Sequence, residues 1–303
     1  MDIMKLLIGS AIITVTCISC NPDARSQSGG TGLYETEQFK KYWYAGNAEL
    51  NAYNLVQSRY GEQRTGKAML IFVTEPFSET KQVKLDNPEA ASADKITVMK
   101  LNYTKNFVTG IYPYSMMLSV FTPISRNQYP HTVKVTMTSQ EWCGHVFSQM
   151  NLKDNRYDVS SFSYFEKEGD VKFVVDNYLL EDELFNMIRI DPENIPEGQI
   201  RILPGLFFTR LKHENLKPLD AKLSRKESET ETTVTIQFPD RLLTIHVAKP
   251  FPHQILGWEE ELGDKTMMTK ATLDKTLVTD YWRKNKNEHL PLRDSLGLSP
   301  NNY

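Results

Sequence analysis

An alternation of apolar and polar residues with a period of two is the feature that most constrains the fold of this chain. In the segment 132–138, Val133, Val135 and Met137 alternate with threonine and lysine. Because successive side chains of a β-strand point to opposite faces of its sheet, this pattern predicts a strand with one face in a core and one in water. The same alternation recurs in four later segments, which are Tyr157 to Phe165, Val234 to Phe238, Leu243 to Val247 and Met267 to Leu273.

In a second group of segments, apolar residues occupy both the odd and the even positions, so that both faces of the strand would be apolar. In the segment 67–74, Met69, Ile71 and Val73 share one face of a strand while Leu70 and Phe72 share the other. A strand of this kind is expected where both faces of a sheet are covered. The strand pattern continues from Ile96 to Tyr103 and from Tyr112 to Val120, and the turns between strands are short enough for hairpins.

Helical spacing of apolar residues interrupts the strands in three segments, which are Glu35 to Tyr44, Leu179 to Ile190 and Pro204 to His213. Pro192 stops the second of them. The regular alternation of strands and helices that is typical of a parallel sheet is not present. The sequence therefore predicts a mainly β chain, built as a curved antiparallel sheet, half-barrel or barrel, with a short helical insert.

The first twenty residues have the pattern of an export signal. Lys5 precedes an apolar run of about ten residues, which is much shorter than the roughly 20 needed to span a bilayer. The segment Cys17-Ile18-Ser19-Cys20 resembles the lipobox of bacterial lipoproteins. This resemblance implies cleavage before Cys20 and lipidation of that cysteine, and Asn21 after it implies sorting to the outer membrane, with the chain facing the periplasm or the surface.

These features divide the chain into four parts. Residues 1–19 are the predicted signal peptide, and residues 20–34 are a lipidated tether whose polar, Gly- and Ser-rich composition is typical of flexible linkers. Residues 35–290 are predicted to form a single β-rich domain, followed by a polar tail over 291–303. Cleavage would remove Cys17 and lipid would block Cys20, so that Cys143 keeps the free thiol and no intrachain disulfide is expected.

The segment from Gln140 to His145 carries the densest group of chemically capable side chains. Cys143 and His145 can act as nucleophile and base, or as ligands of a soft metal. The structural alternative is a strand end where Trp142 packs, Cys143 is a small buried hydrophobe, and Gly144 permits a bulge or turn. The structural alternative is favoured because free cysteines are among the most buried residue types.

Other polar motifs indicate neither a cofactor nor a metal site. The remaining histidines lack the spacing of zinc ligands, and a formal net charge of −3 with scattered Lys and Arg argues against nucleic acid as a partner. The acidic runs Glu181-Asp182-Glu183 and Glu259-Glu260-Glu261 are interpreted as solvated faces, the first one suited to a helix dipole. Paired-carboxylate catalysis is not expected, because nothing places two of these groups across a cleft.

The segment Ser139 to Phe147, with Tyr112-Pro113-Tyr114-Ser115-Met116-Met117 upstream, resembles an uncharacterised family of lipoproteins from Bacteroidota. Members are sometimes labelled "septum formation inhibitor Maf". The resemblance extends over most of the mature chain and implies an envelope lipoprotein, without an established activity to carry over. Maf nucleotide pyrophosphatases are cytoplasmic and carry a Ser- and Arg-rich phosphate-binding motif, which this chain lacks, so pyrophosphatase activity is not expected.

The first expected function is that of a non-enzymatic, membrane-anchored envelope lipoprotein that binds an apolar ligand or an envelope partner through its curved sheet. The alternative is a thiol-dependent hydrolase or transferase that uses Cys143 and His145. A third possibility is a structural protein that docks a partner through a sheet edge.

Overall fold

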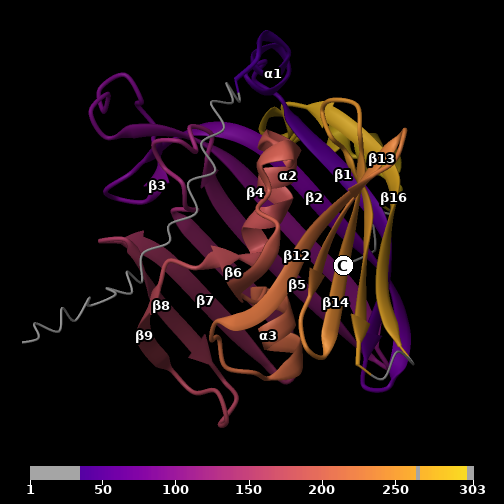
Figure 1. Ribbon diagram of the computed structural model, residues 1–303. Helices are drawn as coiled ribbons and strands as arrows, with labels where there is room; N and C mark the ends of the chain where they lie inside the picture. The colour runs from indigo at the N-terminus through magenta and orange to yellow at the C-terminus, as the bar shows by residue number, and fades with distance from the viewer. Residues whose placement is uncertain (1–34, 264–266, 299–303) are drawn as a thin grey trace, which may run out of the picture. The chain divides into compact units, whose positions relative to one another are not determined.

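A single β-sheet of 16 strands is the frame of the chain (Figure 1). The computed structural model describes residues 35–263 and 267–298, so that Cys20 and the predicted signal peptide and tether lie outside the described residues. In the first half, strands adjacent in the chain pair antiparallel, with β3 on the side of β2. These strands are β1 (Ala48–Arg59), β2 (Glu62–Ser78), β3 (Val83–Lys84), β4 (Lys95–Thr109), β5 (Tyr112–Pro123), β6 (Lys134–Glu141), β7 (Gly144–Lys153), β8 (Arg156–Ser163) and β9 (Val171–Asp176).

The second half of the chain continues the same sheet, because its last strand, β16, pairs antiparallel with β1. Its strands are β10 (Leu179–Leu180), β11 (Gly198–Leu203), β12 (Leu219–Glu227), β13 (Glu231–Gln237), β14 (Arg241–Ala248), β15 (Ile255–Leu262) and β16 (Met268–Thr279). The short pair β10 and β11 is parallel. The two ends of the sheet are β9 and β10, which do not pair, so the described sheet is curved but not closed. The predicted mainly β fold with a helical insert is confirmed.

Helices α2 (Leu184–Ile190) and α3 (Leu206–Lys212) cover the concave side of this sheet, which we call the inner face; the opposite side is the outer face (Figure 1). The helical elements are α1 (Glu37–Trp43), the 3-10 helix η1 (Glu181–Glu183), α2 (Leu184–Ile190), η2 (Pro192–Asn194), α3 (Leu206–Lys212), η3 (Tyr281–Arg283), η4 (Asn287–His289) and α4 (Pro291–Asp294). The three predicted helices correspond to α1, to η1 with α2, and to α3. Thr36 caps α1 by accepting a hydrogen bond of 3.1 Å from the Phe39 N–H.

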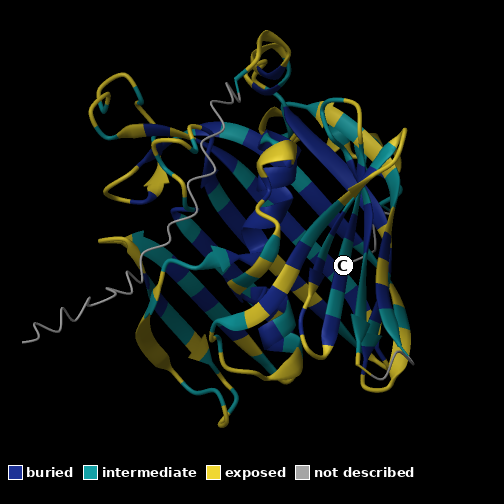
Figure 2. Cartoon of the chain, viewed as in Figure 1, coloured by how far each residue is buried: buried dark blue, intermediate teal, exposed yellow. Residues whose placement is uncertain are grey.

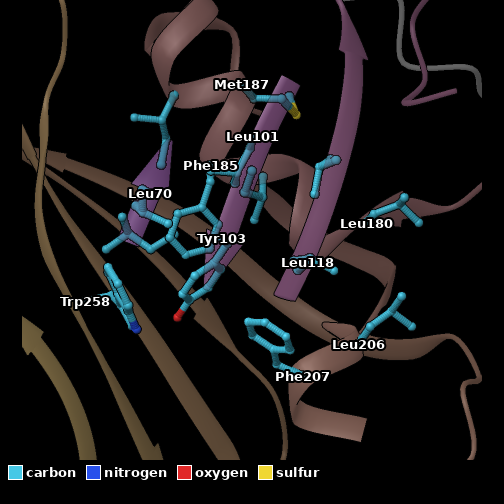
Figure 3. Close-up of a cluster of buried hydrophobic side chains, with 14 of the residues drawn as sticks. Leu70, Leu101, Tyr103, Leu118, Leu180, Phe185, Met187, Leu206, Phe207 and Trp258 are labelled. Atoms are coloured by element: carbon cyan, nitrogen blue, oxygen red, sulfur yellow. The ribbon is translucent and has the colours of Figure 1, made fainter. Parts of the chain in front are cut away.

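The main core lies between the inner face and the helices (Figures 2 and 3). Trp258 of β15 is at its centre, with its ring 5.2 Å from that of Tyr103 and 5.8 Å from that of Phe185, measured between centroids. Phe207 of α3 approaches Tyr103 from the other side at 5.0 Å. Each such side chain contributes roughly 1.5–3 kcal/mol when fully buried. These contacts explain why α2, a helix of only seven residues, is stable: all seven are buried.

A buried ion pair also fixes α2 on the sheet. Arg189 is completely buried and donates a hydrogen bond of 2.7 Å to the Glu49 carboxylate on β1. The same carboxylate accepts hydrogen bonds from the Tyr42 hydroxyl and the Asn51 amide, and the Arg189 guanidinium lies 4.8 Å from the ring centroid of Phe72. Burial by itself would raise the pKa of Glu49, but the charge of Arg189 and the hydrogen bonds from Arg189, Tyr42 and Asn51 together outweigh it, so the pKa is lowered.

Candidate functional site

An apolar cluster lies on the outer face of the sheet, away from the main core. Its buried members are Ala48, Leu50, Ala52, Met69, Val73 and Leu296, and Ile71, Leu277, Tyr281 and Leu298 pack against them. The segment of β2 that is apolar on both faces therefore packs one face in the main core and the other in this outer cluster, as its sequence predicted. Leu296 and Leu298 belong to the segment predicted as a polar tail, so the chain is packed on the sheet as far as residue 298.

A groove of about 1070 Å³ runs between this outer face and the C-terminal segment. Its volume slightly exceeds the roughly 300–1,000 Å³ that is usual for small-molecule sites. Trp142 lines the groove although 70% of its surface is exposed. The apolar lining residues, from five strands and the C-terminal segment, are Leu50, Met69, Ile71, Phe107, Val108, Pro113, Leu277, Leu292, Leu296 and Leu298.

The charged side chains that line the groove are Lys67, Lys284, Arg293 and Glu141, and the imidazole of His289 also lines it. Lys67 is held in place by Asp274, with 2.9 Å between Nζ and Oδ2. Lys284 lies 3.5 Å from Asp280. A groove with an apolar floor and a few fixed polar groups is the usual composition of a site that orients an amphiphilic ligand.

The predicted packing of the Trp142-Cys143 segment is wrong. Strand β6 ends at Glu141 and β7 begins at Gly144, so these two residues form the loop of a tight hairpin and both are exposed. Side chains in a two-residue loop project beyond the sheet, which is why the general tendency of cysteine to be buried does not apply. The turn lies at Trp142 and Cys143, and Gly144 is the first residue of β7, where a Cβ would lie only 2.7 Å from Cδ1 of Tyr164.

The hairpin does not bring Cys143 and His145 together as a nucleophile and its base. The two residues would share a face on a continuous strand, but the strand is interrupted between them. The Glu141 side chain accepts a hydrogen bond of 2.5 Å from the Cys143 N–H, and its carboxylate raises the pKa of the Cys143 thiol. A raised pKa lowers the thiolate fraction at neutral pH, and the thiolate is the nucleophilic form.

Replacing Glu141 by Gln should therefore make Cys143 more reactive. The amide can still accept the Cys143 N–H, but it carries no charge to disfavour the thiolate. We expect the rate of alkylation by iodoacetamide at pH 7 to rise several-fold in Glu141→Gln, with the two rates converging at high pH. Equal rates at pH 7 would show that Glu141 does not control the thiol.

The acidic run over η1 is buried, contrary to its interpretation as a solvated face. Arg241 of β14 donates two hydrogen bonds to the Glu181 carboxylate and one of 2.9 Å to Glu260 of β15. Glu183 accepts a hydrogen bond of 2.7 Å from the Thr132 hydroxyl. The run could not be recognised as buried from its own sequence, because its partners are distant in the chain.

Asp182 is the strongly perturbed member of this cluster. Burial, reinforced by the negative charge of Glu181, raises the pKa of Asp182 to about 7. Its carboxyl group accepts a hydrogen bond of 3.0 Å from the Leu206 N–H at the start of α3. Burial also lowers the pKa of Lys105, which donates to the Gln57 side chain at 3.3 Å. The Asp182 bond joins η1 to α3, and the Lys105 bond joins β4 to β1.

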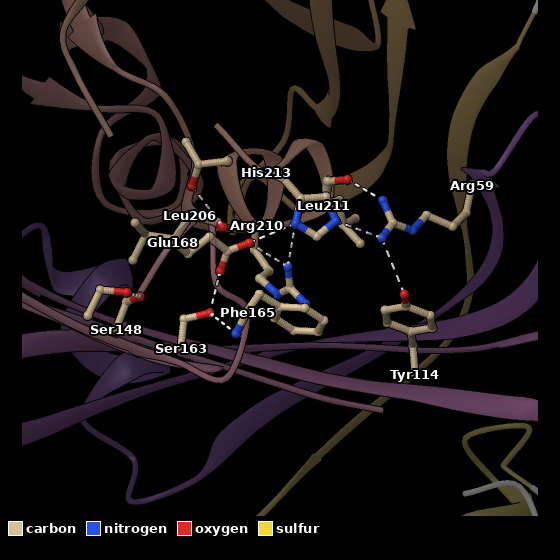
Figure 4. Close-up of polar contacts among 12 residues, drawn as sticks. Arg59, Tyr114, Ser148, Ser163, Phe165, Glu168, Leu206, Arg210, Leu211 and His213 are labelled. Carbon is tan, nitrogen blue, oxygen red and sulfur yellow. Dashed lines mark hydrogen bonds and ion pairs between the residues drawn. The ribbon is translucent and has the colours of Figure 1, made fainter. Parts of the chain in front are cut away.

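A second polar cluster that sequence reasoning missed surrounds the end of α3 (Figure 4). Nδ1 of His213 lies 2.7 Å from Oε1 of Glu168, and Arg210 donates to the same oxygen at 3.0 Å. Because a carboxylate only accepts, Nδ1 is the donor and Nε2 faces Arg59, 3.4 Å away, as an acceptor. Arg59 also donates to the Leu211 carbonyl. The cluster joins α3 to β1 and to the loop after β8.

In the described ranges, no group of three or more His, Cys, Asp or Glu side chains is arranged to hold a metal ion. Within the same ranges, no helix combines the length and apolar character needed to cross a membrane. Comparisons with known protein families, with curated proteins and with solved structures find no match to this chain.

Proposed function

We propose that the protein is a membrane-anchored envelope lipoprotein that binds an amphiphile, with an acyl chain and an anionic head group, in the outer-face groove. The observation that carries the proposal is the groove itself: about 1070 Å³ of space over a floor of leucine, methionine, isoleucine and valine side chains. Burying one methylene group of an acyl chain in such a site contributes about 0.8 kcal/mol.

The inner face offers less support for an apolar ligand than the outer groove. Helices α2 and α3 occupy the concave side, where every residue of α2 is buried. A ligand there would have to displace the packed rings of Tyr103, Phe185 and Trp258. The sequence-based expectation of an apolar ligand is therefore retained, but its site moves to the other face of the sheet.

The charges of the groove favour an anionic head group. Lys67, Lys284 and Arg293 line the groove with one carboxylate, that of Glu141, and Lys67 and Lys284 are each also paired with an aspartate beside the groove. Carboxylate and phosphate groups form their strongest hydrogen bonds with such cations. The membrane attachment in this proposal rests on the lipobox resemblance at Cys20 and on the tether that follows it.

The thiol-dependent alternative has less support. Cys143 and His145 are separated by the end of a hairpin, and the pKa of the thiol is raised. Neither feature activates a nucleophile.

Filling the groove should weaken ligand binding. Ser115 lines the groove and is exposed on the outer face of β5, so a larger side chain there does not enter the main core. We expect Ser115→Trp to reduce the affinity for a fluorescent long-chain fatty acid by at least about tenfold, which corresponds to about 1.4 kcal/mol. The measurement is a fluorescence titration of the full chain.

Met117 provides the matched control. It is exposed on the same face of the same strand, two residues further along, and does not line the groove. Met117→Trp should bind the fatty acid with the same affinity as the unmodified protein. Ser115→Trp and Met117→Trp should both unfold at the same temperature as the unmodified protein. The proposal fails if the unmodified protein shows no saturable binding, or if the two tryptophan variants bind equally well.

A further inference from the structure

Strand β9 ends the sheet with an unprotected edge. It pairs with β8 on one side, and no strand of the described chain pairs with its other side. Five of its six residues are exposed, among them the large apolar residues Val171, Phe173 and Val174 (Figure 2). Sheet edges are usually blunted by proline, by charged side chains such as lysine, by a bulge or by a covering segment, because their free N–H and C=O groups pair readily with another strand. The sequence of β9 contains no proline, its pairing with β8 shows no bulge, and its two charges, those of Lys172 and Asp176, are of opposite sign.

The side chains of β9 divide between the two faces in a simple way. Val175 packs against the main core, so Phe173 shares the inner face with it. Lys172, Val174 and Asp176 therefore lie on the outer face, with a cation at one end and a carboxylate at the other. Lys172 forms no ion pair with the described residues, and Asp176 lies 3.1 Å from Arg156 in an exposed pair.

We infer that β9 is a dimerisation edge, which pairs antiparallel with β9 of a second copy of this chain across a twofold axis at Val174. In this register Lys172 lies opposite the partner's Asp176, and the axis repeats this pair on the other side. Oppositely charged residues directly across an antiparallel pair contribute roughly 0.2–1 kcal/mol each, and like charges destabilise it. The twofold contact is closed, as expected for a homodimer rather than a fibre.

The charge pattern selects this register over its neighbour. If the axis lay at Phe173 instead, Lys172 would face the partner's Val174 and Asp176 would face the partner's Asp170. Both charge pairs would then be lost. One six-residue strand buries little surface, so the dimer is expected to be weak in dilute solution and favoured at high local concentration.

Disulfide trapping tests this register directly. In the full chain purified in detergent, with Cys143→Ser to remove the exposed thiol, Val174→Cys places two thiols across the axis. Residues directly opposite each other in an antiparallel pair have Cα atoms about 4.5–5.5 Å apart, within the range that a disulfide spans. Mild oxidation should therefore convert Val174→Cys to a covalent dimer.

Lys172→Cys is the matched control, since its two copies would be separated by four residues, roughly 13 Å along the strands. It should stay monomeric alone but cross-link when mixed with Asp176→Cys. A Val174→Cys chain that remains monomeric, or that cross-links no better than Lys172→Cys, would overturn the proposal.

Charge reversal gives a second, independent readout. Lys172→Glu and Asp176→Lys should each lower the dimer fraction in sedimentation, because each places like charges opposite one another. An equal mixture of the two variants should recover it, because both charge pairs of the mixed dimer are again attractive. Failure of the mixture to recover the dimer, with both variants folded by circular dichroism, would also count against this register.

Discussion

Replacing Arg241 by Met should lower the free energy of unfolding by about 3–5 kcal/mol, the usual cost of removing one partner from a buried ionic network. The guanidinium is buried and bonds to the carboxylates of both Glu181 and Glu260. It also lies against the rings of Phe208 and Phe238, at 3.9 and 4.3 Å from their centroids. Methionine preserves much of this packing, so the loss reports mainly on two carboxylates left without their cation. Denaturant unfolding at pH 7 measures it.

An exposed ion pair provides the control. Arg201 lies 3.4 Å from Asp220, and more than half of each side chain is in contact with solvent. Exposed pairs contribute about 0–1 kcal/mol, so Arg201→Met should change stability by less than about 1 kcal/mol. Adding Glu181→Gln to Arg241→Met should recover part of the loss, since one uncompensated charge is removed. Similar losses for Arg241→Met and Arg201→Met would show that the network around Arg241 is solvated.

The architecture was predictable from the sequence because it depends on local periodicity. The segment 132–138 alternates strictly, and its apolar residues are buried where the pattern places them, with Val135 and Met137 in the main core. The doubly apolar segment 67–74 likewise has one face in each of two cores. Helix α2 ends at Ile190, just before Pro192, as the sequence predicted. Backbone geometry alone connects these patterns to strands and helices.

The polar sites were not predictable, because they depend on contacts between distant segments. An acidic run such as Glu181-Asp182-Glu183 looks solvated until a strand 60 residues later supplies Arg241. His213 and Glu168 are separated by 45 residues, and neither belongs to a recognisable motif. The prediction that Cys143 is buried was wrong for a different reason. It rested on the residue type alone, whereas the position of Cys143 in a two-residue loop determines its exposure.

The apolar outer surface could be predicted from the sequence, but the groove above it could not. An apolar ligand was expected because several strands are apolar on both faces, and the outer face does carry such a surface. What the sequence did not reveal is that the segment after Pro291 returns to that face. Its leucines are spaced too irregularly to indicate a helix or strand, although Leu292, Leu296 and Leu298 all line the groove. Short irregular segments leave little periodic signal.

Asp182→Asn should stabilise the protein most above pH 7, less at pH 5, and have little effect only below about pH 3.9, the pKa of an unfolded aspartate. Asp182 has a pKa of about 7 in the folded protein, against about 3.9 for an unfolded aspartate. Between these values the folded state binds a proton that the unfolded state has released. Stability from this group is therefore lost as the pH rises, and the loss is complete above about pH 7. Asparagine carries no charge, and its Oδ1 can still accept the Leu206 N–H.

The expected gain in the free energy of unfolding at pH 8 is about 1–3 kcal/mol. This is less than the full difference between the folded and unfolded pKa of Asp182 implies, because the neighbouring charged groups rearrange when Asp182 is replaced by a neutral residue. Burial lowers the pKa of His131 and of His253, which removes stability as the pH falls below about 6.5 and so opposes the effect of Asp182 in the wild-type curve. Both histidines are present in the variant as well, so the difference between the two denaturation series from pH 5 to 8.5 isolates Asp182. Parallel curves would mean that Asp182 is ionised throughout, and that α3 begins on a charged carboxylate.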